Sequence, residues 1–256
     1  PGGGLMIVGG TISLALLSYY VARAFLAAGA GEEARELAGS VIFRVSALHG
    51  LILALVFAEE LVNLNSVEET ASHEAATVAD VFYDLQRYDE EATRPIRAEL
   101  AAYVFAVSGE EWETLATHGQ LSENAWARWI GAYEAILELE PQGIVQRELK
   151  AILLNDIREV SELRMARENA AGTGVNALFM AAAVLGVVLT SMSFFTFPPN
   201  RTNVLLLSVF GAYTGVVIYF IVAFADPYLR PGSVEPLAFQ RLLVGEVKEL
   251  AEVPTR

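Results

Sequence analysis

The residues best able to do chemistry lie in an otherwise apolar stretch, residues 40–60. In a helix with 100° between neighbouring residues, six of them share one stripe. The six are Ile42, Ser46, His49, Leu53, Val56 and Glu60. A titratable side chain, a short apolar section and an acid in succession are typical of an ion pore, in which apolar constrictions gate and charged rings select. We therefore predict that this stripe lines a pore.

His49 also has a structural interpretation. Titratable side chains inside a membrane usually face the interior of a helix bundle or water. The imidazole would then hydrogen-bond a neighbouring helix, and Gly50 would let that helix approach closely. The near-neutral pKa of histidine permits a pH switch at this position but does not establish one.

Two charged residues near the ends of this stretch, Arg44 and Glu59, are predicted to attract ions. Arg44 would do so together with Arg23 and Arg201. In the alternative interpretation, the Arg44 side chain extends to the aqueous edge of the membrane. The acids that it would meet there are Glu32, Glu33 and Glu36. Glu59 and Glu60 would then only mark the water boundary.

A membrane helix must hold the stripe, and the composition supports this. Hydrophobic residues make up 54% of the 256 residues, and the mean hydropathy is +0.42, which is rare for a soluble domain. Four stretches approach the ~20 residues that a helix needs to cross a bilayer. They cover residues 5–28, 40–60, 175–197 and 203–225. None alternates with a period of two, so we predict an all-α polytopic membrane protein with four transmembrane helices.

The charge is concentrated between the second and third spans. The chain has 31 acidic and 17 basic residues, a net charge of −14, and residues 59–170 alone hold 23 acids and 9 bases. We therefore predict an acidic helical domain inserted between these spans, and this acidity disfavours nucleic acid as a partner. The predicted parts are membrane helices one and two in residues 1–58, the acidic domain in 59–174, membrane helices three and four in 175–225, and an amphipathic tail in 226–256.

Apolar residues at the start of the acidic domain recur three or four positions apart, as in a coiled-coil seam. They are Leu64, Val67, Ala71, Ala75, Val78, Phe82 and Leu85. Because no Gly or Pro interrupts residues 51–94, the second span and this seam are predicted to form one long helix. Acids beside the seam are expected to face solvent. These acids are Glu68, Glu69, Glu74 and Asp80.

The sequence offers no pattern for a metal, a cofactor or an enzymatic reaction. It contains no cysteine, and His73 and His118 stand apart from other ligand types. We found no nucleophile–base motif, phosphate-binding loop or dinucleotide fingerprint. We therefore predict no metal, no cofactor and no enzyme activity, and place Trp126 and Trp129 in a core or an interface.

Two segments and the order of the elements carry a family resemblance. The segments are LILALVFAEELVNLNSVEETASHEAATVADVFYDLQRY, residues 51–88, and FADPYLRPGSVEPLAFQRLL, residues 224–243. With two spans, an acidic helical insert, two spans and a tail, the chain resembles the bacterial bestrophin-like integral membrane family of unknown function. Its similarity to true bestrophins is more distant and implies a homo-oligomer, with a pentamer expected, whose second span surrounds a central pore.

The chain also departs from the true bestrophins. Leu53 and Val56 stand where those channels use aromatic neck residues, and no acidic cluster matches their calcium clasp. Neck gating and calcium activation therefore do not carry over.

The first functional hypothesis is an oligomeric ion channel of the bacterial inner (plasma) membrane, with the lipid bilayer and inorganic ions as its partners. Lys and Arg near the span ends weakly favour a cytoplasmic acidic domain. The alternative is a membrane-anchored interaction or sensor protein without a pore. The anchor hypothesis predicts a monomer or a dimer, whereas about five subunits favour the channel.

Overall fold

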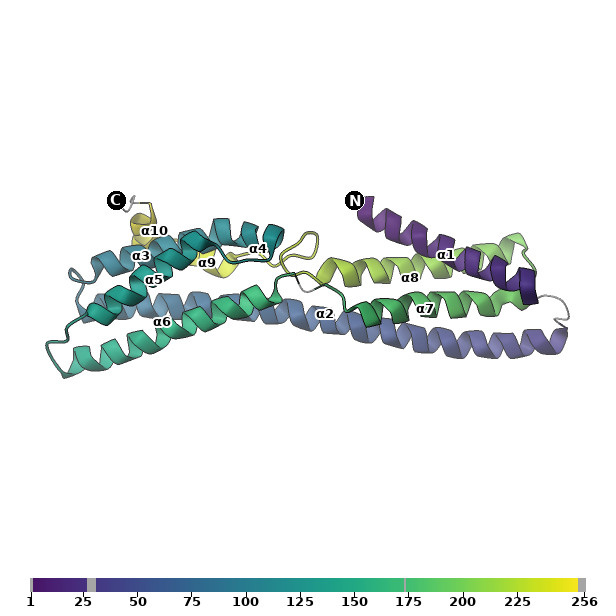
Figure 1. Ribbon diagram of the computed structural model, residues 1–256, viewed down its shortest axis with the longest axis horizontal. Coiled ribbons are helices and arrows are strands. Elements are labelled where there is room, and N and C mark those ends of the chain that lie inside the picture. The colour runs from purple at the N-terminus through teal and green to yellow at the C-terminus, as the bar shows by residue number, and fades with distance from the viewer. Residues whose placement is uncertain (1, 27–30, 173, 253–256) are drawn as a thin grey trace. The chain divides into compact units, whose positions relative to one another are not determined.

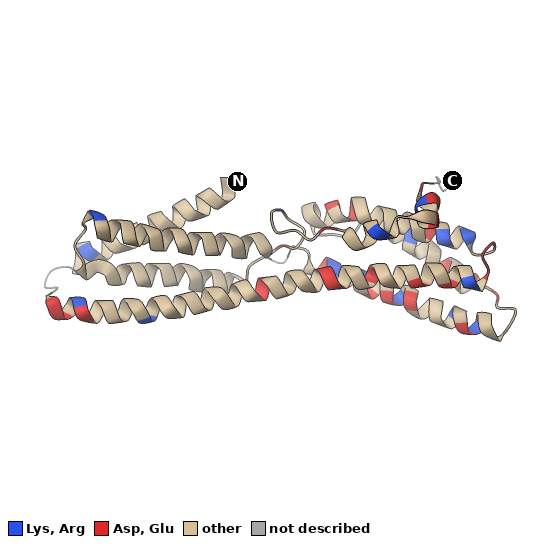
Figure 2. Ribbon diagram, turned by 180° about the vertical axis from the view of Figure 1, so that it is seen from behind, with Lys and Arg blue, Asp and Glu red and all other residues tan. Residues whose placement is uncertain are grey.

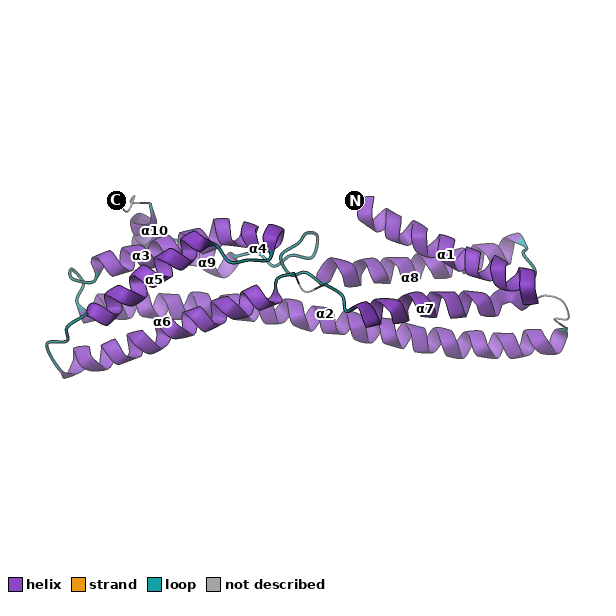
Figure 3. Cartoon of the chain, in the orientation of Figure 1, coloured by secondary structure: helices purple, strands orange, loops and turns teal. Residues whose placement is uncertain are grey.

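The structure is a computed structural model that describes residues 2–26, 31–172 and 174–252. Over these residues it is built of helices and contains no strand (Figure 1 and Figure 3), which confirms the all-α prediction. The chain divides into two compact units. Unit 1 comprises Pro1–Val62 and Gly174–Ala225, and unit 2 comprises Asn63–Thr173 and Asp226–Arg256.

Unit 1 is a bundle of apolar helices. It contains α1 (Gly2–Leu26), α7 (Ala177–Ser193), the 3₁₀ turn η2 (Phe194–Thr196), α8 (Arg201–Phe224) and the first part of α2 (Glu32–Tyr88). Four helices of the chain are long and apolar enough to cross a membrane, namely α1, α2, α7 with η2, and α8. The four spans predicted from the sequence are therefore present as candidate membrane helices, and their apolar parts contain few charged residues (Figure 2).

Glycines let α1 and α8 approach closely. A Cβ atom placed on Gly211 would lie 2.9 Å from the Cα of Ile12, and one on Gly215 would lie 2.8 Å from the Cα of Val8. Both distances are to backbone, which has little freedom to move. Helices inside a membrane gain little from the hydrophobic effect between them, so close backbone contact supplies much of their association energy.

Unit 2 is a helical domain with charged residues distributed along its helices (Figure 2). Its helices are the second part of α2, α3 (Arg94–Ala106), the π-helical turn η1 (Val107–Glu111), α4 (Trp112–His118), α5 (Glu123–Glu138), α6 (Ile144–Ala170), α9 (Leu237–Leu242) and α10 (Gly245–Ala251). The predicted seam of α2 is buried in its core. The prediction of one long helix is also confirmed, because α2 runs for 57 residues without a break.

The segment after α8 belongs to the core of unit 2. Phe239 of α9 is fully buried, and Val247 and Leu250 of α10 are nearly so. The indole Nε1 of Trp112 donates a hydrogen bond to the Val234 carbonyl at 2.9 Å. Burial of these apolar side chains is the main force that fixes the tail.

We expect Gly211→Ala to destabilise unit 1 by about 1–3 kcal/mol, because the added methyl group overlaps the backbone of α1. Gly9→Ala is the matched control, since nothing lies within 4 Å of a Cβ atom at that position. The measurement is the thermal unfolding midpoint of the purified protein in detergent. Equal midpoints for the two variants would contradict the close contact.

Candidate functional site

The predicted pore stripe of α2 faces other helices of its own chain. Its buried members are His49, Leu53, Val56 and Glu60, with 4%, 5%, 5% and 9% of their surfaces exposed. Ile42 and Ser46 are half-buried. Leu53 and Val56 pack in a cluster whose other buried members, on α7 and α8, are Ala183, Ile218 and Ile221. Pore lining by this stripe stays a prediction, and the burial of four members argues against it.

His49 sits directly on Gly186 of α7. A Cβ atom on Gly186 would lie only 1.9 Å from the His49 Nδ1 atom, whereas one on Gly50 would meet nothing within 4 Å. The glycine that permits close approach is therefore Gly186 and not the expected Gly50. The expected hydrogen bond is absent, because neither ring nitrogen of His49 has a partner among the residues that the structure describes.

The opposite face of α2 is uncovered. Its residues recur four or three positions apart and are all exposed in the chain. They are Arg44, Leu48, Leu51, Leu55, Ala58 and Val62. We call this set the free face of α2. Glu59, the second residue predicted to attract ions, is also exposed.

Arg23, expected to act together with Arg44, has a structural role. Its Nη1 atom donates to the carbonyl oxygens of Phe195 at 3.0 Å and Phe197 at 2.9 Å. Arg35 donates to the Thr196 carbonyl at 3.3 Å. The two guanidinium groups therefore hold the connection between α7 and α8, and their charge is partly used by these backbone oxygens.

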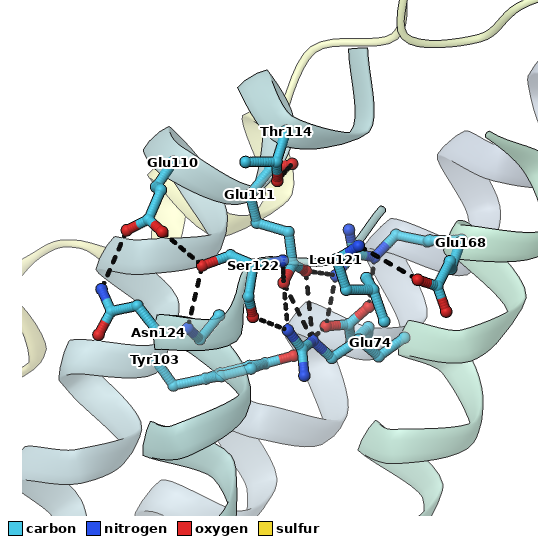
Figure 4. A network of polar contacts seen from close by, with 12 residues as sticks. Glu74, Tyr103, Glu110, Glu111, Thr114, Leu121, Ser122, Asn124 and Glu168 are labelled. Carbon is cyan, nitrogen blue, oxygen red and sulfur yellow. Dashed lines mark hydrogen bonds and ion pairs between the residues drawn. The ribbon is translucent and has the colours of Figure 1, made fainter. Parts of the chain in front are cut away.

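A second polar site, which the sequence did not reveal, lies inside unit 2 (Figure 4). Arg167 donates to the two carboxylate oxygens of Glu74 at 2.6 and 3.0 Å, and to Glu111 at 2.7 Å. Arg164 also binds Glu111, through Nε at 3.1 Å and through Nη2. All four side chains are fully buried. We call these four residues the buried ion network.

Neighbouring groups add hydrogen bonds to the network, although the Nη1 atoms of Arg164 and Arg167 have no partner among the described residues. The Tyr103 hydroxyl donates to Glu74, and the Ser122 amide donates to Glu111 at 3.1 Å. The Arg164 guanidinium lies 5.1 Å from the Trp126 ring centre, and that of Arg167 lies 5.2 Å from the Trp112 ring centre. Aromatic faces at such distances stabilise cations electrostatically.

Local helix geometry brings the network together. Arg164 and Arg167 are three residues apart on α6 and so share one face. Glu111 is the last residue of the π-helical turn η1, which changes the register between α3 and α4. Glu74 was expected to face solvent. It lies at the edge of the apolar seam, three residues after Ala71, and this position is the signal that could have revealed it.

The charges of the network hold one another in the ionised state. Burial raises the pKa of the Glu111 carboxyl, but the nearby Arg167 and Arg164 outweigh this effect and leave that pKa below its ordinary value. For Arg167, Glu74 and Glu111 overcome the effect of burial and place the pKa well above its ordinary value. Burial raises the pKa of the neighbouring Tyr228 to about 12. Two cations and two anions therefore cancel at neutral pH.

Comparison with known proteins places the chain in a family. A sequence model of the Bestrophin-like domain matches residues 9–239, nearly the whole chain. The chain belongs to the Bestrophin-like family. It is a membrane protein, and the resemblance predicted from its sequence is confirmed. A search of curated protein sequences found no match.

Solved structures share the fold of this Bestrophin-like chain. A bacterial bestrophin homologue from Klebsiella pneumoniae solved by Zn-SAD phasing aligns with a TM-score of 0.66 at 12% identity, covering 96% of this chain and 98% of that one. A point variant of a homologue from the same organism gives 0.66 at 12%, covering 97% and 99%. A point variant of a membrane protein gives 0.68 at 11%, covering 99% and 100%. At these identities the comparison establishes the fold alone.

We expect Glu111→Gln to destabilise unit 2 by about 3–5 kcal/mol, because it removes one charge from a buried set and leaves its arginines without full compensation. Glu113→Gln is the matched control, since Glu113 is exposed and close in sequence. Chemical denaturation followed by tryptophan fluorescence measures the difference. Similar loss of stability in both variants would mean that Glu111 is not part of a buried network.

The lowered pKa of Glu111 also predicts a pH dependence. The stability that this carboxylate contributes is present above the unfolded-state pKa of about 4.3 and is lost as the pH falls through the folded-state value. The wild-type protein should therefore lose stability below about pH 4.3, and this decline should be smaller in Glu111→Gln. Denaturation midpoints measured across an acidic pH series test this. Parallel curves for the two proteins would contradict the assignment.

Proposed function

We propose that the protein is an oligomeric ion channel of the bacterial inner membrane, in which the α2 helices of several copies surround a central pore. Membership of the Bestrophin-like family supports this proposal, as does a fold shared with bacterial bestrophin homologues. Further support comes from the four candidate membrane helices. We also propose that the acidic unit lies in the cytoplasm.

The observation that carries the proposal is the free face of α2. Apolar residues spaced four and three apart along an uncovered helix suit a symmetric bundle of several α2 helices, because this spacing keeps one face towards a common axis. We therefore place the pore wall on the free face. The stripe that contains Leu53 and Val56 then supports this wall from behind, through its contacts with α7 and α8.

The chemistry of the free face suits an ion path with a narrow apolar section. Leu48, Leu51 and Leu55 are consecutive on it and expose 62%, 56% and 62% of their surfaces. Rings of such side chains close a pore by excluding water, and small movements of the helices reopen it. Arg44 lies at one end of this section and would favour anions there, whereas the charge of −14 on residues 59–170 favours cations on its own side of the membrane.

Cysteine labelling tests the pore wall directly, because the natural chain contains no cysteine. We expect a charged thiol reagent to change ion flux through liposomes that contain Leu55→Cys. Leu206→Cys is the matched control, because Leu206 is equally apolar and 56% exposed on α8 but lies outside the free face. Flux that responds to labelling at position 206 and not at position 55 would place the pore elsewhere.

The oligomeric state separates the channel from the alternative of a membrane anchor without a pore. We expect light scattering of the detergent complex to give several subunits, with five expected from the family resemblance. A monomer with no ion flux in liposomes would support a membrane-anchored interaction or sensor protein instead.

A further inference from the structure

The contact between His49 and Gly186 joins α2 to α7 inside unit 1. The imidazole occupies the space that any side chain at position 186 would fill. Phe210 of α8 approaches the same ring, with 6.3 Å between ring centres. Only 4% of the His49 surface is exposed, and both of its nitrogens lack a partner in the described part of the chain. An uncharged imidazole fits this environment, although it leaves its polar atoms unsatisfied.

No acidic group is available to pair with a protonated His49. The sequences of α1, α7 and α8 contain no Asp or Glu. On α2 the nearest acids in sequence are Glu36 and Glu59, which lie 13 and 10 residues from His49. At 1.5 Å per residue these separations are roughly 20 and 15 Å. A proton on the ring would therefore create a charge without a counter-charge.

The other titratable and charged groups on the surrounding helices do not change this conclusion. On α1 they are Tyr19, Tyr20 and Arg23, on α8 they are Arg201, Tyr213 and Tyr219, and α7 has none. Arg44, on the free face of α2, is itself a cation. An unpaired charge in an apolar interior is strongly unfavourable. The protonated ring must therefore move away from Gly186, or water must enter the bundle.

Two buried hydroxyl groups follow Gly186 on α7. Thr190 is one turn beyond Gly186 on the same face of α7, and its Oγ1 atom has no partner among the described residues. The Oγ atom of Ser191 is also buried and has no partner among the described residues. These hydroxyls can bind water that enters the bundle, because unsatisfied buried polar groups are the usual partners of internal water.

We propose that the His49–Gly186 contact is a proton-operated switch. The neutral imidazole holds α2 against α7, and protonation releases α2. This inference rests on the proposed channel function only where it links movement of α2 to ion flux. If α2 carries the proposed pore wall, release of α2 from α7 lets the free face move, and acid then opens the pore.

Spin labels on α2 and α7 test the switch without any need for ion flux. Phe43→Cys on α2, outside the free face, and Leu185→Cys on α7 place one label on each helix at positions that are 76% and 55% exposed. The chain has no natural cysteine, so only these two positions react. Labelled protein diluted with unlabelled copies is reconstituted in liposomes, and the distance between labels is measured from about pH 8 to about pH 5, the range over which histidine changes charge.

Three variants in this labelled background define the mechanism. With His49 present, we expect the label distance to lengthen in acid and ion flux to rise. His49→Gln, which stays neutral, should abolish both changes. Gly186→Ala should give the long distance at every pH, because its methyl group excludes the ring. Gly50→Ala is the matched glycine control and should behave like the parent protein, since nothing lies within 4 Å of its added Cβ atom.

The outcomes separate this inference from the proposed function. A constant label distance in the parent protein overturns the switch, even if flux depends on pH. A distance change that persists in His49→Gln also overturns it, because the responding group would then lie elsewhere. A His49-dependent distance change without any ion flux supports the switch and contradicts the channel. His73→Gln and His118→Gln, the other two histidines, should retain the response.

Discussion

Unit 2 depends on four buried charges that must cancel. Arg164, Arg167, Glu74 and Glu111 have no contact with solvent, so each is tolerable only while its partners are in place. The four come from α2, the π-helical turn and α6, which are distant in sequence. A buried ion network is a poor source of net stability compared with a well-packed apolar core. Removing one partner would leave an uncompensated buried charge, so an arrangement that separates these segments is disfavoured.

Unit 1 is built on the opposite constraint. Its helices carry few charges in their interior, so steric fit contributes much to how they associate. Gly186, Gly211 and Gly215 each accept a neighbouring side chain or backbone where another residue would collide. His49 is a buried titratable group of this bundle whose ring nitrogens have no hydrogen-bond partner among the described residues.

The sequence predicted the elements of the fold well because they follow from hydropathy and spacing. Four apolar stretches became candidate membrane helices, and the seam from Val67 to Leu85 became the buried side of α2. It was harder to predict which face of each membrane helix packs against its neighbours. A helical stripe with a histidine can point to a pore or to a neighbouring helix, and the contact of His49 with Gly186, far along the chain, is not contained in the local pattern.

The buried ion network was missed for a related reason. Acidic residues on a helix are usually solvated, and the charged partner of Glu74, Arg167, lies 93 residues later in the chain. The π-helical turn that directs Glu111 inward has no clear signature in the sequence. Burial of a charge is therefore set by long-range contacts that local patterns do not contain.

The stacked aromatic side chains of unit 2 give the protein a built-in optical label. Trp126 stacks on Trp129 with ring centres 4.8 Å apart, and Trp129 stacks in turn on Tyr133 at 5.2 Å. The only other tryptophan of the chain is Trp112, also in unit 2. Intrinsic indole emission therefore reports on unit 2 alone, and two of its three sources lie against the guanidinium groups of Arg164 and Arg167. Tryptophan fluorescence will therefore change when unit 2 rearranges, and it will not report directly on rearrangements within unit 1.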